Sequence, residues 1–139
     1  MAKGAALFRL DKRYAEEIIA HGQAEAPLEC CGILAGIDDK VMKLYRTTNS
    51  EKSPLRYNVE PHELLRIYRE LDEKGWQLLA IYHSHPNSEA YPSATDIKLA
   101  QFLDVLHLIV SLREVVPLVR AFWLSGGQIK EETVSIVEA

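Results

Sequence analysis

The sequence predicts an α/β fold, a single domain spanning residues 1–139 and built around one sheet flanked by helices. Three observations lead to this fold class. Segments with strand-like and helix-like apolar spacing alternate along the chain, as expected when strands and helices share a core. The chain has 139 residues, a length that favours one domain over two. Its apolar fraction of 47% is ordinary for a globular domain and excludes disordered and collagen-like classes.

Two strands and one helix are expected before the first clear turn. Ala5–Leu10 has the length and apolar content of a short strand. Asp11 has the carboxylate of an N-cap, and the helix after it is weakened at Gly22 and ended by Pro27. The apolar residues of this helix recur at helical spacing, at Tyr14, Ile18 and Ile19. The apolar, glycine-containing segment Cys30–Ile37 predicts a buried strand.

A hairpin and a second helix come next. Asp38 and Asp39 form a turn, after which Val41–Tyr45 alternates as the hairpin partner. Pro61 suits the first turn of a helix, and Gly75 suits its end. The expected apolar face of this helix consists of Leu64, Tyr68 and Leu71.

The second half of the chain supplies the remaining elements. Leu78–Tyr82 predicts a short strand that runs directly into His83. After a polar loop, Ser93 is expected to cap a third helix. This helix would turn three residues inward, namely Ile97, Ala100 and Leu103. The last strands are Leu106–Leu112, Leu118–Leu124 and one that follows a turn at Gly126-Gly127 and ends at Val137.

Charge and cysteine content limit the partners and the compartment. Lys plus Arg total 16 and Asp plus Glu total 20, so composition offers no basic face and no nucleic-acid partner is expected. No segment approaches the roughly 20 apolar residues that cross a bilayer, and charges interrupt the N-terminal segment before signal-peptide length. We therefore expect no membrane partner and a reducing cytoplasm. Cys30 and Cys31 are expected to be unpaired apolar fillers of the sheet, and Cys31 could also line a substrate groove.

His83, His85 and Asp96 have the spacing of a metal site. Residues i and i+2 of a strand face the same side with Cα atoms about 6–7 Å apart, so both imidazoles can reach one ion. Asp96 follows at the start of a helix, where the helix dipole favours a carboxylate. Two histidines and one carboxylate leave the fourth position of zinc to water, as in catalytic sites. The pattern predicts one catalytic Zn²⁺ per chain.

Two other interpretations use the same residues. Ser93-x-x-Asp96 is also a helix-capping pattern without catalytic meaning. A cupin-like small-molecule metalloenzyme would use His83, His85 and Glu89, but the flanking glycines are absent and the helices argue against a barrel of strands alone. The zincin motif His-Glu-x-x-His and the deaminase motif Cys-x-x-Cys do not occur.

The motif His83-Ser84-His85-Pro86, followed by Ser93-x-x-Asp96 and preceded by a glutamate, resembles the JAMM (MPN-plus) metalloprotease family. The segment Pro27-x-Glu29-x-Cys31-Gly32-x-Leu34-x-Gly36 is similar to the glutamate-bearing strand of its small prokaryotic members. The order of expected elements also agrees, so the resemblance covers nearly the whole chain. It implies a deaminase-like (MPN) α/β domain with helices around a curved mixed sheet. The chain lacks the length for the large insertions that give eukaryotic members polyubiquitin linkage selectivity.

Resemblance and chemistry together suggest a role for each motif residue. His83, His85 and Asp96 would hold Zn²⁺, which brings the pKa of bound water to about 7. Glu29 would be the general base and would later deliver the proton to the leaving amine. Its alternative is an idle, solvated carboxylate at a strand start. Ser93 would donate a hydrogen bond to the oxyanion, unless it is only an N-cap.

We therefore expect a zinc-dependent metallopeptidase or isopeptidase. The resemblance implies hydrolysis of the bond after the C-terminal tail of a ubiquitin-like protein, such as a sulfur carrier or small protein modifier. That bond could join the tail to a lysine, a single cysteine or a short extension. The tail would lie extended beside a strand edge, near the loops Thr47–Tyr57 and Asn87–Tyr91. The alternative is a non-catalytic MPN-type scaffold, and a homodimer stays open. Histidines without a partner pattern are expected to be structural or exposed, namely His21, His62 and His107.

Overall fold

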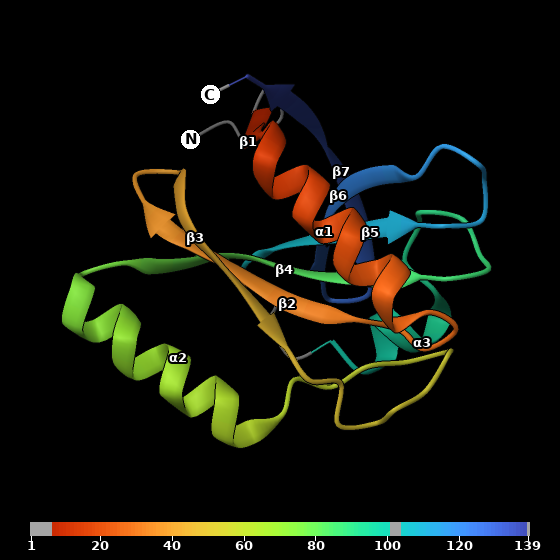
Figure 1. Cartoon of the computed structure of the whole chain (residues 1–139), viewed down its shortest axis with the longest axis horizontal. Coiled ribbons are helices and arrows are strands. Elements are labelled where there is room, and N and C mark those ends of the chain that lie inside the picture. The colour runs from red at the N-terminus through yellow and green to blue at the C-terminus, as the bar shows by residue number, and fades with distance from the viewer. Residues whose placement is uncertain (1–6, 101–103, 139) are drawn as a thin grey trace.

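The strands of the structure, a computed structural model that describes residues 7–100 and 104–138, form one seven-stranded sheet (Figure 1). The elements in chain order are β1 (Leu7–Asp11), α1 (Lys12–Glu25), β2 (Cys31–Ile37), β3 (Lys40–Thr47), α2 (Pro61–Lys74), β4 (Gln77–His85), α3 (Ala94–Lys98), β5 (Leu106–Ser111), β6 (Leu118–Ser125) and β7 (Gln128–Val137). The strand order is β1-β7-β6-β5-β4-β2-β3. β4 pairs with β5, and β1 with β7, in parallel, whereas the other neighbours are antiparallel.

The sheet curves until its edge strands β1 and β3 approach each other. Leu7 and Arg9 of β1 line one groove together with Lys40 and Val41 of β3. The predicted α/β fold with a curved mixed sheet flanked by helices is therefore confirmed. The two parallel pairings and the helices argue against the cupin interpretation, which requires a barrel of strands alone.

The helices α1 and α2 cover opposite faces of the sheet (Figure 1). Ile18 of α1 belongs to a buried apolar cluster with Leu34 of β2 and even-numbered residues of β4. Ile67 and Leu71 of α2 pack against Ile33, the neighbour of Leu34 in β2. Because successive strand residues point to opposite faces, β2 and β4 are buried on both sides.

Close contacts fix β4 against its neighbours. A Cβ atom added at Gly32 in β2 would collide with the ring of Tyr82, so only glycine leaves room for that side chain. The Tyr82 hydroxyl lies 2.7 Å from Nδ1 of His21 in α1. At Gly22, a Cβ would come within 3.3 Å of the Ser84 Cβ. The even-numbered residues of β4 are thus held against α1.

Two details of the first helices differ from the predictions. Asp11 occupies the N-cap position of α1, but its side chain makes no capping bond and lies 3.6 Å from Arg13 instead. The helix continues past Gly22 to Glu25 and ends before Pro27, as predicted, and Gly22 allows close packing on the sheet. In α2, Ile67 is buried and Tyr68 is 44% exposed. Either residue could lie on the apolar face of the helix, but Ile67 packs against the sheet and Tyr68 faces water. The prediction that Tyr68 belongs to the buried face is therefore wrong.

The third helix is shorter than predicted. α3 ends at Lys98, so Ala100 lies outside it and only its first turn, capped by Ser93, resembles the prediction. Leu103, expected to point inward, falls outside the described residues, as do Ala5 and the start of the first predicted strand.

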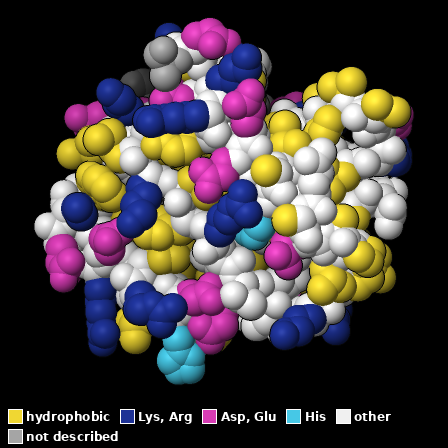
Figure 2. Space-filling model, viewed as in Figure 1, with side chains coloured by type: hydrophobic (Ala, Val, Ile, Leu, Met, Phe, Trp, Pro, Cys, Tyr) yellow, Lys and Arg dark blue, Asp and Glu magenta, His cyan; other side chains and the backbone are white. Residues whose placement is uncertain are grey.

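The surface agrees with the balanced composition. On the face shown in Figure 2, basic and acidic side chains are interspersed rather than gathered by sign. Within residues 7–100 and 104–138, no helix combines the length and the apolar character that crossing a bilayer requires.

Candidate metal centre and active site

Three side chains meet at the end of β4. The Nε2 atom of His83 lies 3.2 Å from Oδ2 of Asp96, and Nε2 of His85 lies 3.0 Å from the same oxygen. The two Nε2 atoms are 3.2 Å apart. All three residues are buried, and among the described residues they form the cluster that could hold a metal ion. The structure therefore brings the three predicted ligands together.

The alternation of β4 explains why the two imidazoles converge. Tyr82 and Ser84 point toward α1, and Ser84 Oγ accepts a hydrogen bond from the Cys30 backbone at 2.8 Å. His83 and His85 therefore share the opposite face. Because β4 is paired on both sides, by β2 and β5, the backbone beneath these histidines is fixed.

A capping box presents Asp96. Its backbone N–H donates to Ser93 Oγ at 3.0 Å, and its Oδ2 accepts from the Ser93 backbone N–H at 2.9 Å. The prediction that Ser93 caps the helix is confirmed. The cap uses a lone pair of Ser93 Oγ and leaves the hydroxyl hydrogen free to donate elsewhere. Capping and an oxyanion contact are therefore compatible in one side chain.

The environment of His85 sets its tautomer. A carbonyl can only accept a hydrogen bond, so the 2.7 Å contact with the Glu89 carbonyl makes His85 Nδ1 the donor and directs Nε2 toward Asp96. Burial alone would lower the pKa of His85, but hydrogen bonds with Asp96 and Glu89 raise it. Burial lowers the pKa of His83 and favours its neutral, ligating form. Burial would raise the pKa of Asp96, but His83 and His85 hold it well below its usual range.

The donor set fits a zinc ion. Zinc bonds of about 2.0–2.1 Å in tetrahedral geometry place ligand atoms about 3.3 Å apart, close to the 3.0–3.2 Å separations in this cluster. Oδ2 of Asp96 and the unprotonated Nε2 atom of a neutral histidine are both hydrogen-bond acceptors. They need a proton or a cation between them to lie this close, and a bound cation would take the place of that proton.

Glu29 lies beside this cluster. In the antiparallel pairing of β2 with β4, Cys31 is opposite His83, so Glu29 falls opposite His85. The residue is only 3% exposed, and its Oε1 has no hydrogen-bond partner among the described residues. Burial, and next the Asp96 charge, raise the pKa of Glu29 to about 8. The alternative of a solvated carboxylate is therefore wrong.

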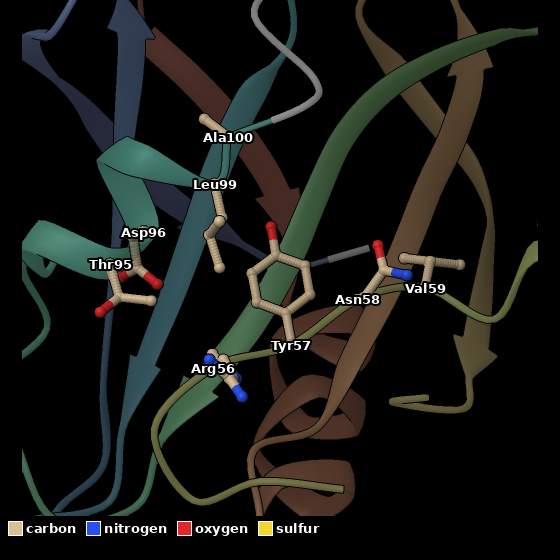
Figure 3. Close-up of a pocket in the computed structure, with 8 residues that line it drawn as sticks. All are labelled: Arg56, Tyr57, Asn58, Val59, Thr95, Asp96, Leu99 and Ala100. Carbon is tan, nitrogen blue, oxygen red and sulfur yellow. The ribbon is translucent and has the colours of Figure 1, made fainter. Parts of the chain in front are cut away.

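Tyr57 forms a wall of the site. Its ring stacks on His83 with centroids 4.5 Å apart and an angle of 21° between the ring planes. A pocket opens next to it, with Thr95, Asp96 and Leu99 on the other side (Figure 3). The loop Thr47–Tyr57, which the sequence suggested for substrate contact, thus reaches the metal cluster.

The second suggested loop, Asn87–Tyr91, supports His85. Besides the Glu89 carbonyl that binds His85, the Ser88 carbonyl accepts a hydrogen bond from Ser111 Oγ at 2.6 Å. The Glu89 side chain itself is exposed and is not part of the metal cluster, which removes the ligand set of the cupin interpretation.

Neither the cysteines nor the other histidines belong to the candidate metal cluster. Cys30 and Cys31 are free and buried, and burial raises their thiol pKa values to about 11 and about 12. Cys31 is fully buried against Thr47 and does not line a groove, contrary to one expectation. His21 and His107 are buried, whereas His62 is exposed beside Glu60.

Two residues of the site were not singled out from the sequence, Tyr57 and Asn49. Asn49 is 9% exposed, and its side chain donates to the Glu29 carbonyl at 3.0 Å. Asparagine in a loop signals a turn, but no spacing rule links it to a glutamate twenty residues earlier. For Tyr57, an aromatic residue in an otherwise polar loop was the available signal.

The fold is that of a JAB/MPN domain. A JAB1/MPN domain protein from Archaeoglobus fulgidus matches with a TM-score of 0.59 at 19% identity, over 91% of this chain and 97% of that one. The family model for prokaryotic homologs of the JAB domain matches residues 11–125. The chain belongs to this family, and the resemblance inferred from its motifs is confirmed.

More similar proteins include two named enzymes. The CysO-cysteine peptidase of Mycobacterium tuberculosis is 36% identical over 87% of this chain and 85% of its own length. The probable TtuB-protein conjugate cleaving protease of Thermus thermophilus is 41% identical over 81% of this chain and 73% of its own length. A solution structure of a protein from Desulfitobacterium hafniense has a TM-score of 0.86 at 33% identity, covering 96% of this chain and 94% of that one.

The raised pKa of Glu29 makes the stability of the metal-free protein depend on pH. Between the ordinary value of 4.5 and about 8, the folded protein binds a proton that the unfolded chain releases. The resulting stabilisation, on the order of a few kcal/mol at most, is complete below the ordinary pKa and lost as the pH rises through the folded pKa. The variant Glu29→Gln lacks this effect. Thermal melts of both metal-free proteins should therefore show wild type losing stability relative to Glu29→Gln from mildly acidic to mildly alkaline pH. Parallel pH curves would contradict the burial of an ionisable Glu29.

Proposed function

We propose that the protein is a zinc-dependent peptidase or isopeptidase that hydrolyses the bond after the C-terminal tail of a ubiquitin-like protein. The observation that carries this proposal is the convergence of His83, His85 and Asp96 beside the buried carboxylate of Glu29. His83, His85 and Asp96 would hold one zinc ion per chain, which when bound supplies a Lewis acid that activates water and polarises the scissile carbonyl.

Glu29 and Ser93 perform the proton transfer and the charge stabilisation. Glu29 accepts a proton from the attacking water and returns it to the leaving amine. Its raised pKa supports this role, because a buried carboxylate near neutrality can both accept and release a proton. Ser93 donates its free hydroxyl hydrogen to the developing oxyanion while its oxygen still caps α3.

The substrate class rests on the relatives. One is named CysO-cysteine peptidase and another probable TtuB-protein conjugate cleaving protease, which supports a ubiquitin-like or sulfur-carrier protein as partner. The scissile bond has three alternatives: it could join the tail to a lysine, to a single cysteine or to a short extension. The extended tail would reach the cluster along the pocket between Tyr57 and α3.

The remaining proposals concern the cell. A non-catalytic scaffold would not need metal ligands at these three positions. The complete set of His83, His85 and Asp96 therefore disfavours that alternative. Two unpaired cysteines are consistent with a reducing cytoplasm. No nucleic-acid or membrane partner is proposed.

The experiment that tests the function compares Glu29→Gln with wild type. Amide replaces carboxylate without changing the metal ligands, so zinc content should be retained while hydrolysis falls by about 10²–10⁴-fold. Rates are measured on three ubiquitin-like fusions, linked to a lysine, a single cysteine and a short peptide. Glu25→Gln, the same substitution at an exposed glutamate of α1, should leave the rates unchanged. Near-wild-type hydrolysis by Glu29→Gln would exclude Glu29 as the base, and no cleavage of any fusion by wild type would exclude the substrate class.

Replacing Ser93 separates its two roles. Ser93→Ala removes the cap, and stability should fall by roughly 0.5–2 kcal/mol. Loss of the oxyanion donor should also lower kcat by about 10²–10³-fold with little change in KM. Ser93→Thr retains a hydroxyl and should recover most of both. Steady-state kinetics and thermal melts in excess zinc provide the two readouts. A variant that melts lower yet turns over normally would show that Ser93 is only a cap.

A further inference from the structure

The side-chain amide of Asn49 uses all of its hydrogen-bonding groups inside the protein. Its Nδ2 donates to the carbonyls of Glu29 and Arg56, each at 3.0 Å. Its Oδ1 accepts from the backbone N–H groups of Glu51 at 3.0 Å and Asn58 at 3.1 Å. At 9% exposure, this amide is largely withdrawn from water. Such a saturated buried amide holds its partners in one arrangement.

The first of these partners is the backbone of the proposed base. β2 begins at Cys31, so Glu29 precedes the strand and lies outside its ladder with β3. The backbone of Glu29 is instead hydrogen-bonded to the loop that contains Asn49 and Ser53. The Glu29 N–H donates to the Ser53 carbonyl at 2.9 Å, and the Glu29 carbonyl accepts from Asn49. Both backbone polar groups of Glu29 therefore depend on the loop that Asn49 closes.

Two of the other partners flank Tyr57. Asn49 binds the carbonyl of Arg56 and the N–H of Asn58, which belong to the residues on either side of Tyr57. A β-bridge between Asn49 and Val59 closes the same segment. The Tyr57 ring then stacks on His83 and lines the pocket (Figure 3). One amide thus connects the backbone of Glu29 with the wall of the site.

We propose that Asn49 is a positioning residue for the reaction: it holds Glu29 opposite His85 and Tyr57 against His83. This inference rests on the proposed function only for the role of Glu29 as base. The hold of Asn49 on the Glu29 backbone can be tested without turnover. None of the four hydrogen bonds of Asn49 reaches a proposed metal ligand, and its bonds to Arg56 and Asn58 go to the backbone of residues that line the pocket. Asn49 therefore acts through other residues.

A simple loop-closing role makes a different prediction. The Oδ1 contacts with Glu51 and Asn58 close the turn, whereas the Nδ2 contacts reach the carbonyls of Glu29 and Arg56. Asn49→Asp is nearly isosteric and keeps the turn-closing acceptor, but it replaces the donor that faces these two carbonyls with a second oxygen. Asn49→Ala removes both functions. If Asn49 only closes the turn through Oδ1, the aspartate variant should behave as wild type.

The test measures three properties of the zinc-loaded variants. We expect Asn49→Ala and Asn49→Asp to retain zinc and to lose about tenfold or more in kcat, with KM changed by less than about threefold. Hydrogen exchange at the Glu29 amide should accelerate by at least about tenfold in both variants. Ser50→Ala, which removes a different bond of the same loop, from Ser50 Oγ to the Asn58 carbonyl, should leave exchange at Glu29 unchanged.

Each outcome decides a separate claim. Wild-type kcat in Asn49→Asp, or unchanged exchange at the Glu29 amide, overturns the positioning role. Equal acceleration in Ser50→Ala also overturns it, because general loosening of the loop would then explain the effect. If Asn49→Ala fails to fold, Asn49→Asp decides alone. If wild type cleaves no fusion, the proposed function fails, and the exchange measurement still decides whether Asn49 holds Glu29 in place.

Discussion

The burial of β4 on both faces is the constraint on which the site depends. A strand packed on both sides has a rigid backbone, and its period of two sends His83 and His85 to one face while Tyr82 and Ser84 are held against α1. The imidazoles therefore need no loop to bring them together. The third member of the cluster, the carboxylate of Asp96, lies on the first turn of α3, whose capping box fixes its orientation. Three side chains from two elements thus converge with little conformational freedom.

The same burial separates two carboxylates by their chemistry. His83 and His85 hold the pKa of Asp96 below its usual range, although burial opposes this, so Asp96 remains charged and suited to a cation. At Glu29, burial and the Asp96 charge outweigh the opposing effect of His85 and raise the pKa to about 8. Two acidic groups whose environments push their pKa values apart are a general mark of divided acid–base roles. In the proposed function, this difference assigns Asp96 as a metal ligand and Glu29 as the group that carries the proton.

The sequence alone predicted the parts of the site that depend on the alternation of a strand or on a local motif. The spacing of His83 and His85 and the capping pattern at Asp96 are short-range, and the curved sheet followed from a recognisable motif order. The position of Glu29 needed the register of β2 with β4, which the sequence only suggests. Asn49 and Tyr57 could not be found in this way, because their contacts join side chains to backbone or ring across a loop without any periodic signal. The end of α3 and the exposure of Tyr68 likewise depend on packing rather than on pattern.

The central claim is that His83, His85 and Asp96 are the ligands of one zinc ion. Anomalous X-ray scattering above and below the zinc absorption edge, on crystals of the protein purified without chelator, tests it most directly. The account predicts one strong zinc peak per chain, within about 2.0–2.1 Å of both Nε2 atoms and of an Asp96 carboxylate oxygen. A fully occupied zinc peak bound to other residues, or no metal in this cluster after equilibration with zinc, would contradict it.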